Sequence, residues 1–240
     1  MSNSNPRSRG VAGWMVVAAI IAIAGCGVDR VSAAQAKPDR LQTVLSQMNA
    51  ASAKFRSAEA DVKKEHFEKM VSDTSSESGT IYFLRSGNAT QVGAKFTNGQ
   101  TLEYKNGLVR LYAAGNNHLE QYSASGSNQA RFETFLTLGF GGSGTDLAKV
   151  WTVTDLGSEQ ISDGGKMVSV EKLDLVSKEA SVRSNFTHIT IWVDPTRGVS
   201  LKQEYFSPSG DTDTAIYTNI RLNQPIDVKA FAIKCQGKCG

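Results

Sequence analysis

The sequence has little net charge with which to attract a polyanion. Its 240 residues contain 26 Lys and Arg against 23 Asp and Glu, a formal charge of +3 at pH 7. Arg7, Arg9, Arg30 and Asp29 all fall within the first 36 residues, so the remainder carries a charge of +1. A near-neutral chain without a basic stripe argues against nucleic acid as a partner. With 40% hydrophobic residues, it can build one domain with a substantial core.

Metal-binding and catalytic signatures are also scarce. The three histidines show no metal-ligand spacing: His66, His118 and His188. Neither a G-x-S-x-G elbow nor a P-loop occurs, and no acidic pair stands out as acid and base. The stretch GFGGSG at 139–144 matches the dinucleotide fingerprint, but a helical pattern precedes it where the fingerprint needs a strand. We interpret it as a helix C-cap and loop. We therefore expect that the protein is not an enzyme and binds neither a metal nor a cofactor. The alternative is an active site assembled from residues distant in sequence.

The chain lacks a long hydrophobic run. The uncharged stretch at 11–25 is shorter than the ~20 residues of a membrane-spanning helix. It follows Arg7 and Arg9 and has the length of the h-region of an export signal. A transmembrane anchor is the alternative. We expect residues 1–36 to be an export signal with a short tether, and residues 37–240 to form a single domain.

Two processing sites are possible in the leader. Ile-Ala-Gly-Cys at 23–26 resembles the bacterial lipobox, which implies cleavage before Cys26 and lipidation of its sulfur. Ordinary cleavage after Ala36 is the alternative. In both cases the protein leaves the cytoplasm, and Cys235 and Cys239 remain as a pair in CQGKC. An oxidising compartment predicts a short-loop disulfide between them. Half of a metal site is the alternative, although no second cysteine pair exists and His188 is the nearest histidine in sequence.

The clearest predicted helix covers PDRLQTVLSQMNAASAKF at 38–55. Pro38 suits its first turn, and Asp39 suits the positive end of its dipole. Its apolar residues recur at helical spacing and form one stripe: Leu41, Val44, Leu45, Met48 and Phe55. The stripe predicts a helix packed on a core.

Most of the remaining chain is typical of antiparallel strands. We predict strands near 59–70, 79–85, 91–97, 100–104, 108–113, 118–123, 150–154, 167–174, 186–193, 199–206 and 212–222. A short helix is expected near 129–138, and the run SDTSSES at 72–78 is expected to be a solvated loop. The Asn-Gly dipeptides in TNGQ and KNGL are strong hairpin signals. The predicted fold is mainly β with helices (α+β): a curved, half-open antiparallel β-barrel covered by the N-terminal helix and the short mid-chain helix.

One strand ends in an unexpected residue. In GTIYFLRSG at 79–87, Arg85 shares a face with Ile81 and Phe83 because alternate side chains of a strand point the same way. A guanidinium among apolar groups needs hydrogen-bond acceptors. The alternative is that Arg85 ends the strand and turns out to water.

Three segments, in this order, carry a resemblance to a known family. GTIYFLRSG is a glycine-led strand closed by arginine, and NGLVRLYAAGNNHLEQY at 106–122 holds a strand, a tyrosine and a polar turn. The stretch at 189–233 contains closing hairpins and a final phenylalanine. Over roughly residues 38–233 the chain resembles the bacterial outer-membrane lipoprotein carrier family, the LolA-like proteins.

The resemblance implies a fold and a function. Proteins of this family form a half-open antiparallel barrel with an apolar concave face under helices. They bind acyl chains of lipoproteins and carry them across the periplasm of Gram-negative-type bacteria without catalysis. Inner-membrane loading proteins and outer-membrane receiving proteins would be partners. The matching arginine, Arg85, would hydrogen-bond the lid helices and latch the empty form. We expect the following cavity lining: Leu41, Val44, Leu45, Met48, Ile81, Phe83 and some of Phe132, Phe135 and Leu136.

The chain also departs from the family pattern. Ser86 stands where the family usually has a proline after the arginine, and GNATQVGAKF is unlike the aromatic-rich family segment. Lipidation of Cys26 would tether the protein, whereas a carrier diffuses. A membrane-anchored acceptor like the LolB protein, or an envelope lipid-binding or sensor lipoprotein, is therefore the alternative function.

Overall fold

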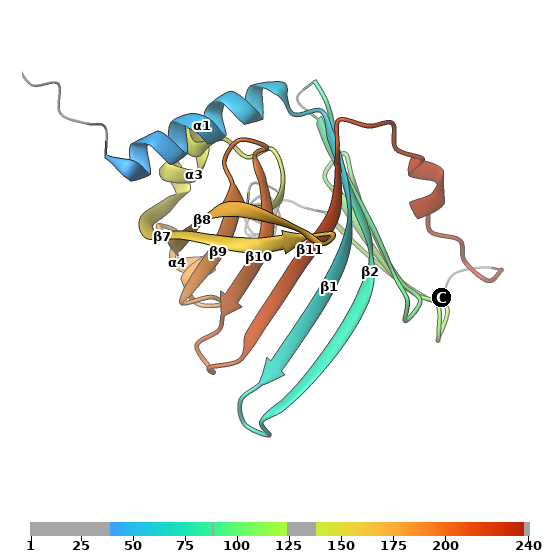
Figure 1. Ribbon diagram of the computed structural model, residues 1–240. Helices are drawn as coiled ribbons and strands as arrows, with labels where there is room; N and C mark the ends of the chain where they lie inside the picture. The colour runs from blue at the N-terminus through green and yellow to red at the C-terminus, as the bar shows by residue number, and fades with distance from the viewer. Residues whose placement is uncertain (1–38, 88, 124–137, 238–240) are drawn as a thin grey trace, which may run out of the picture. The chain divides into compact units, whose positions relative to one another are not determined.

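The computed structural model describes residues 39–87, 89–123 and 138–237. The described residues form one antiparallel sheet of eleven strands, accompanied by short helices. Figure 1 shows the curvature of this sheet, with one helix lying across one end. The predicted fold class, mainly β with helices in a curved half-open barrel, is confirmed.

The strands follow each other as hairpins, with one long-range junction. Their bounds are β1 (Ser57–Glu68), β2 (Asp73–Ser86), β3 (Ala89–Phe96), β4 (Gln100–Lys105), β5 (Leu108–Ala113), β6 (His118–Ser123), β7 (Trp151–Asp163), β8 (Lys166–Ser177), β9 (His188–Asp194), β10 (Val199–Phe206) and β11 (Thr212–Leu222). The order across the sheet is β6-β5-β4-β3-β2-β1-β11-β10-β9-β8-β7. The first strand therefore pairs with the last, and β6 and β7 form the two edges.

Helices pack on both faces of the sheet. They are α1 (Arg40–Lys54), α3 (Gly144–Val150), α4 (Ala180–Arg183) and the 3-10 helix η1 (Val228–Phe231). The helices α1, α3 and α4 lie on one face, and η1 lies on the other. The N-terminal helix α1 was predicted and is confirmed. The helix expected near 129–138 lies outside the described residues except for its last position. No sequence pattern had predicted α3, which Ser143 caps by accepting a hydrogen bond from the Asp146 amide.

One prediction about a loop is wrong. The run at 72–78 was expected to be solvated loop, but β2 begins at Asp73, which pairs with Glu68 across the hairpin. Ser72 has a φ of 51° and belongs to the turn. Nearly every residue at this end of β2 is exposed to solvent, and the side chains on both faces of the strand are polar. Since apolar alternation marks only half-buried strands, the strand left no periodic signal here.

The buried apolar side chains form two clusters. Val44, Leu45 and Met48 of α1 pack against Trp151 and the inward residues of β8, β9 and β10. The second cluster joins β1, β2 and β3 to β10 and β11, and it includes Phe83. The helix stripe therefore covers one half of the concave face, and the other half holds the site described below.

A C-terminal segment packs on the opposite face of the sheet. The side chain of Tyr82 points away from Phe83 and lies over Gly93, where an added Cβ would come within 2.3 Å of the tyrosine ring. Phe231 of η1 meets the same ring edge-on, with centroids 4.7 Å apart. The amide of Ile233 donates to the Glu103 carboxylate at 2.5 Å. These contacts fasten the end of the chain to the outside of β2, β3 and β4.

Candidate functional site: an apolar cavity on the concave face

A cavity of about 640 Å³ lies on the concave face of the sheet. It is lined by side chains of β1, β2, β3, β4, β10 and β11, with Phe186 after α4 at one side. The apolar and aromatic residues of the lining are Val62, Ile81, Phe83, Val92, Ala94, Phe96, Leu102, Phe186, Tyr205, Ala215 and Tyr217. Its volume falls within the ~300–1,000 Å³ of small-molecule sites.

Strand register explains why these residues meet. Ile81 of β2 pairs with Ala60 on one side and Ala94 on the other. Phe83, two positions along, pairs with Ala58 and Val92. Paired residues share a face in an antiparallel sheet, so alternate positions of several strands present one continuous surface. The alanines leave room in front of the larger side chains.

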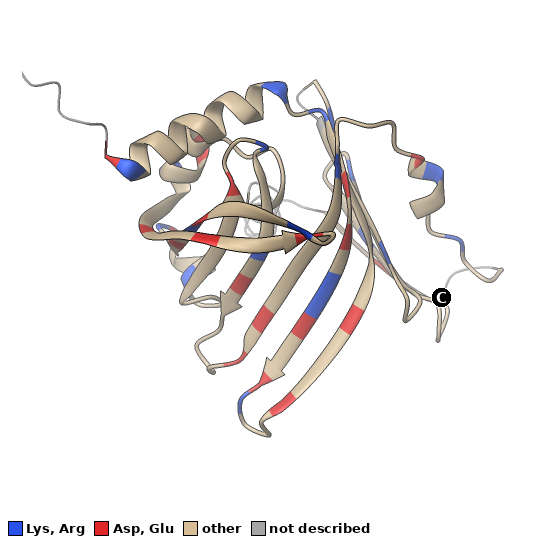
Figure 2. Cartoon of the chain, viewed as in Figure 1, with Lys and Arg blue, Asp and Glu red and all other residues tan. Residues whose placement is uncertain are grey.

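The end of the cavity away from α1 is polar. There, β1 and β2 run on to their turn, and Figure 2 shows Lys, Arg, Asp and Glu positions coloured along these ends of the strands. The ammonium group of Lys64 lies 2.7 Å from the Glu77 carboxylate, and His66 Nδ1 lies 2.7 Å from Asp213 Oδ1. His66 and Asp213 are about half exposed. The hydrogen bond to Asp213 raises the pKa of His66, and nearby carboxylates add to this rise.

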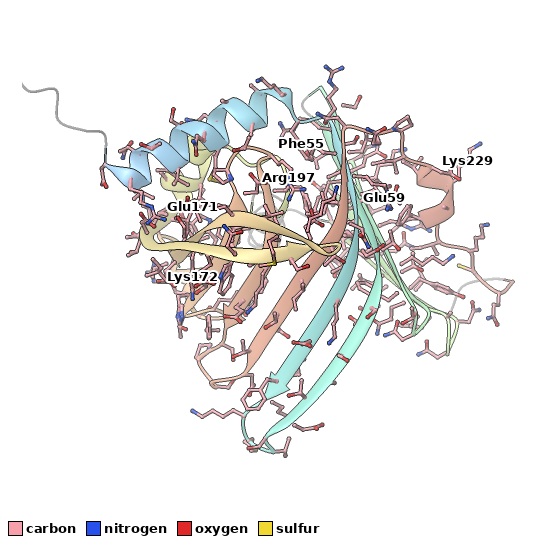
Figure 3. The ribbon with its side chains drawn as sticks, viewed as in Figure 1. Phe55, Glu59, Glu171, Lys172, Arg197 and Lys229 are labelled. Atoms are coloured by element: carbon pink, nitrogen blue, oxygen red, sulfur yellow. The ribbon has the colours of Figure 1, made fainter. Side chains whose placement is uncertain are left out.

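Arg85 is not among the described residues that line the cavity; it lies on β2 two positions beyond the lining residue Phe83, next to the end of α1. Its guanidinium donates from Nη1 to the Ser52 carbonyl at 3.0 Å and from Nη2 to the Gly141 carbonyl at 2.7 Å. It also lies over the Phe55 ring, 5.3 Å from the centroid. Figure 3 labels Phe55 where α1 ends. The alternative of an arginine turned out to water does not describe this contact set.

The two acceptors of Arg85 come from different segments. Ser52 belongs to the last turn of α1, whose carbonyls lack helical partners and carry the negative end of the dipole. Gly141 belongs to the loop before α3 and also accepts a hydrogen bond from the Ser52 hydroxyl at 2.7 Å. Arg85 therefore joins the sheet to α1 and to this loop at one point.

The backbone conformation and the close packing at position 141 require a glycine. It has a φ of +71°, and an added Cβ would lie 2.4 Å from the Phe55 ring. The stretch at 139–144 is thus a loop that packs flat against an aromatic ring and then enters α3. Leu138 and Gly139, the described residues just before this loop, are helical rather than extended, in agreement with the interpretation of the sequence.

The predicted lining residues fall into three groups. Ile81 and Phe83 line the cavity. Val44, Leu45 and Met48 are buried in the neighbouring core under α1, with Leu41 partly buried beside them, and none of these four is among the described residues that line the cavity. The remaining expected residues, Phe132, Phe135 and Leu136, lie outside the described residues.

Sequence reasoning missed most of the lining, including three residues that contact one another. Tyr205 and Tyr217 donate their hydroxyl groups to Gln203 Oε1, at 2.6 and 3.2 Å. Burial raises the pKa of both tyrosines, so their hydroxyls stay protonated at neutral pH. The available signal was the alternation of Gln203 and Tyr205 along β10. It assigns them to one face but does not show that this face meets β1.

Cysteines and ionisable clusters add no further site. Cys235 is disulfide-bonded, while its expected partner Cys239, like Cys26, lies outside the described residues. Among the described residues, no group of three or more His, Cys, Asp and Glu side chains could hold a metal ion. No helix in the described ranges is long and apolar enough to span a membrane.

Comparison with known proteins gives a likeness in structure but none in sequence. No family model and no curated protein matches the chain. The crystal structure of MucB matches with a TM-score of 0.50 and 12% identity over 80% of this chain and 62% of MucB. A Vibrio parahaemolyticus domain provisionally described as an outer membrane lipoprotein-sorting protein matches with a TM-score of 0.42, 12% identity, and 80% and 97% coverage.

A LolA superfamily protein from Nitrosomonas europaea matches with a TM-score of 0.38 and 14% identity, over 80% of this chain and 97% of that one. At these identities the likeness concerns the fold alone. The chain shares the fold of the matching part of MucB.

Proposed function

We propose that this protein binds the acyl chains of lipoproteins or lipids in the cavity and transfers them within the bacterial envelope, without catalysis. The proposal depends on the cavity of about 640 Å³, which has an apolar lining and a polar, exposed mouth. An acyl chain has the matching form, because its tail is apolar and its head is polar.

The free energy of burial is sufficient for such binding. Each methylene that leaves water contributes about 0.8 kcal/mol, so ~10 methylenes contribute about 8 kcal/mol before the cost of ordering the chain. Along β1, the depth from Lys64 at the mouth to Ala58 corresponds to about 20 Å at ~3.3 Å per residue. A single long chain can therefore extend from the mouth toward the end of α1.

Arg85 latches the empty form in this proposal. Its two hydrogen bonds fasten α1 and the loop at Gly141 over the sheet, beside the cavity-lining Phe83. A hydrogen bond from a charged donor contributes roughly 1.5–3 kcal/mol. Two such bonds are weaker than the burial of one acyl chain, so an entering ligand can displace them. The latch then opens only when cargo is present.

The turn between β1 and β2 provides a means of meeting a membrane. Met70 is 90% exposed and Val71 is 61% exposed, at the end of the strands that lead to the mouth. Two exposed apolar side chains at a protruding turn can enter the interfacial layer of a bilayer. Acyl chains would then pass between membrane and cavity over a short path.

The cellular setting follows from the leader. With residues 1–36 as an export signal, the mature protein works in the periplasm, with loading and receiving proteins as partners. If Cys26 is lipidated, the same cavity serves an anchored acceptor or lipid sensor. Palmitate labelling of wild type and Cys26→Ala distinguishes a diffusing carrier from an anchored protein: label that depends on Cys26 favours the acceptor.

Native mass spectrometry of the purified protein tests the binding function. We expect co-purifying lipid or lipopeptide, and we expect Ile81→Glu to remove it by placing a charge on the cavity wall. Thr80→Glu is the matched control, because its side chain lies on the other face of β2. Lipid-free spectra for the wild type, together with no acyl binding on addition of lipid, would refute the proposal.

A further inference from the structure

The cavity lining ends before the strands reach α1. On β1 and β10 the described lining ends at Val62 and Gln203. The next alternate positions toward α1 are Ala60 and Leu201, which are 1% and 0% exposed and do not line the cavity. The side chain of Ala60 is too small to fill the space in front of it. A larger side chain from another segment must therefore close this end of the cavity.

Phe140, in the loop before α3, fills this position. Its ring centroid lies 4.3 Å from that of Phe83 and 5.1 Å from that of Tyr217, which it meets edge-on. Both of these rings line the cavity, and we call them the cavity floor. Phe140 itself is 4% exposed, is not among the described lining residues, and belongs to the same buried cluster as Ala60 and Leu201. It therefore packs directly behind the cavity floor.

The residue that follows Phe140 carries the latch. The Gly141 carbonyl accepts from Arg85 Nη2 and from the Ser52 hydroxyl, each at 2.7 Å. Its amide donates to the Gly198 carbonyl at 2.9 Å. Phe140 and Gly141 share a rigid peptide unit, so the Phe140 ring cannot leave its place without moving the acceptor of Arg85. The cavity floor and the latch are therefore coupled through one peptide.

The residues around Phe140 allow the ring to move. Gly139 precedes it, and Gly141 and Gly142 follow it. Glycines permit backbone changes that other residues resist, and hinges are often built from small residues. The next residue, Ser143, caps α3 by accepting from the Asp146 amide. The loop can therefore turn about its glycines while α3 stays capped.

This arrangement makes the response depend on the length of the acyl chain. On β1 the lining runs from His66 to Val62, about 13 Å at ~3.3 Å per residue. An extended decanoyl chain has about this length, whereas a palmitoyl chain is much longer. The shorter chain fits between the mouth and the cavity floor and leaves Phe140 in place. The longer chain buries its last methylenes only if the Phe140 ring gives way.

We propose that Phe140 is a specificity-determining residue, because only acyl chains long enough to displace its ring release Arg85 from Gly141. This inference rests on the proposed acyl-binding function and narrows it. Long chains open the latch and are the cargo, whereas medium chains bind in the cavity and leave the latch closed.

A series of lysophosphatidylcholines from octanoyl to palmitoyl tests the inference, with binding measured by calorimetry below each micelle concentration. For the wild type, each added methylene should raise the affinity about fourfold, which is about 0.8 kcal/mol, until the chain reaches the cavity floor. The next methylenes should then add little, because they must displace Phe140. Phe140→Ala should abolish this plateau, and Phe140→Leu, which removes less volume, should shorten it. Phe231→Ala is the matched control, since Phe231 is also buried against an aromatic ring, that of Tyr82, but on the opposite face of the sheet.

Hydrogen exchange of the wild-type protein makes the test independent of whether the variants fold. The Gly141 amide is held by the Gly198 carbonyl, so its exchange reports movement of the loop. Saturation with the decanoyl lipid should leave exchange in the loop at 139–143 unchanged or slower, whereas the palmitoyl lipid should raise it several-fold.

Uniform steps across the whole series, or equal loop exchange with both lipids, overturns the inference while leaving acyl binding intact. A plateau that Phe231→Ala also abolishes overturns it too, since the effect would not then belong to Phe140. Failure of every member of the series to bind overturns the proposed function as well.

Discussion

Replacement of Arg85 by leucine is the sharpest test of the latch. The change removes two hydrogen bonds, to the Ser52 and Gly141 carbonyls, and the stacking on Phe55. Charged hydrogen bonds contribute roughly 1.5–3 kcal/mol each, but leucine regains part of this by burying apolar surface without the cost of desolvating a guanidinium. We expect a net loss of about 2 kcal/mol in the free energy of unfolding of the empty protein. For a domain of this size that corresponds to a fall of about 4–8 °C in Tm.

The latch predicts that this loss depends on ligand. When acyl chains have already displaced Arg85, its substitution removes nothing further, so wild type and Arg85→Leu should have similar Tm values in the loaded state. Acyl affinity should be equal or higher in the variant, and release to acceptor vesicles slower. Thermal scans of empty and loaded protein, together with a transfer assay using fluorescent acyl lipid, measure these quantities.

Arg221→Leu is a suitable control for Arg85→Leu. Arg221 makes one ion pair with Glu59, at 2.6 Å, and its side chain is 47% exposed. Exposed pairs contribute at most ~1 kcal/mol, so this variant should show a small loss that is the same with and without ligand. If Arg85→Leu behaves like the control, or transfers acyl lipid at the wild-type rate, the latch mechanism is wrong.

Three further outcomes are expected. Gly141→Ala should lower the free energy of unfolding by more than about 2 kcal/mol, since it combines a positive φ with a clash against an aromatic ring; denaturant unfolding measures this, and a loss below ~1 kcal/mol would contradict it. The raised pKa of His66 means that its pairing with Asp213 stabilises the protein below the ordinary histidine pKa and that this contribution is lost as the pH rises through the raised value. Stability of wild type against His66→Gln across pH 5–9 checks this, and parallel curves would refute it. Met70→Ser with Val71→Ser should reduce sedimentation with phospholipid vesicles several-fold while leaving binding of soluble lysolipid unchanged; undiminished sedimentation would rule out the turn as the membrane contact.

The strands were predictable where local chemistry marks their ends. Asn106 and Gly107 both adopt positive φ in the turn between β4 and β5, as the Asn-Gly signal requires. The polar half of β2 gave no such signal, because both of its faces are exposed and its pairing with β1 is set by the hairpin register. The helix α3 was not predicted, because the glycines that precede it are typical of the end of a helix and a loop.

The sequence predicted which face of β2 the site residues occupy, but not which groups from other segments they contact. Alternation placed Ile81, Phe83 and Arg85 on one side of β2, and the structure keeps them there. The acceptors of Arg85 are backbone carbonyls, which every residue has, so no sequence pattern identifies them. Gln203 shares the cavity lining with residues of β1 because β10 lies two strands from β1, a neighbour relation between distant segments that side-chain periodicity does not contain.

The junction of β1 with β11 has a consequence for how the chain acquires its structure. The two strands at the middle of the sheet come from the beginning and the end of the domain, so Val62 meets Tyr217 only after the last hairpin has been made. Such distant pairing slows the final assembly. A nascent chain that cannot complete its centre until synthesis ends remains extended for longer, which suits the proposed export through a narrow channel before folding.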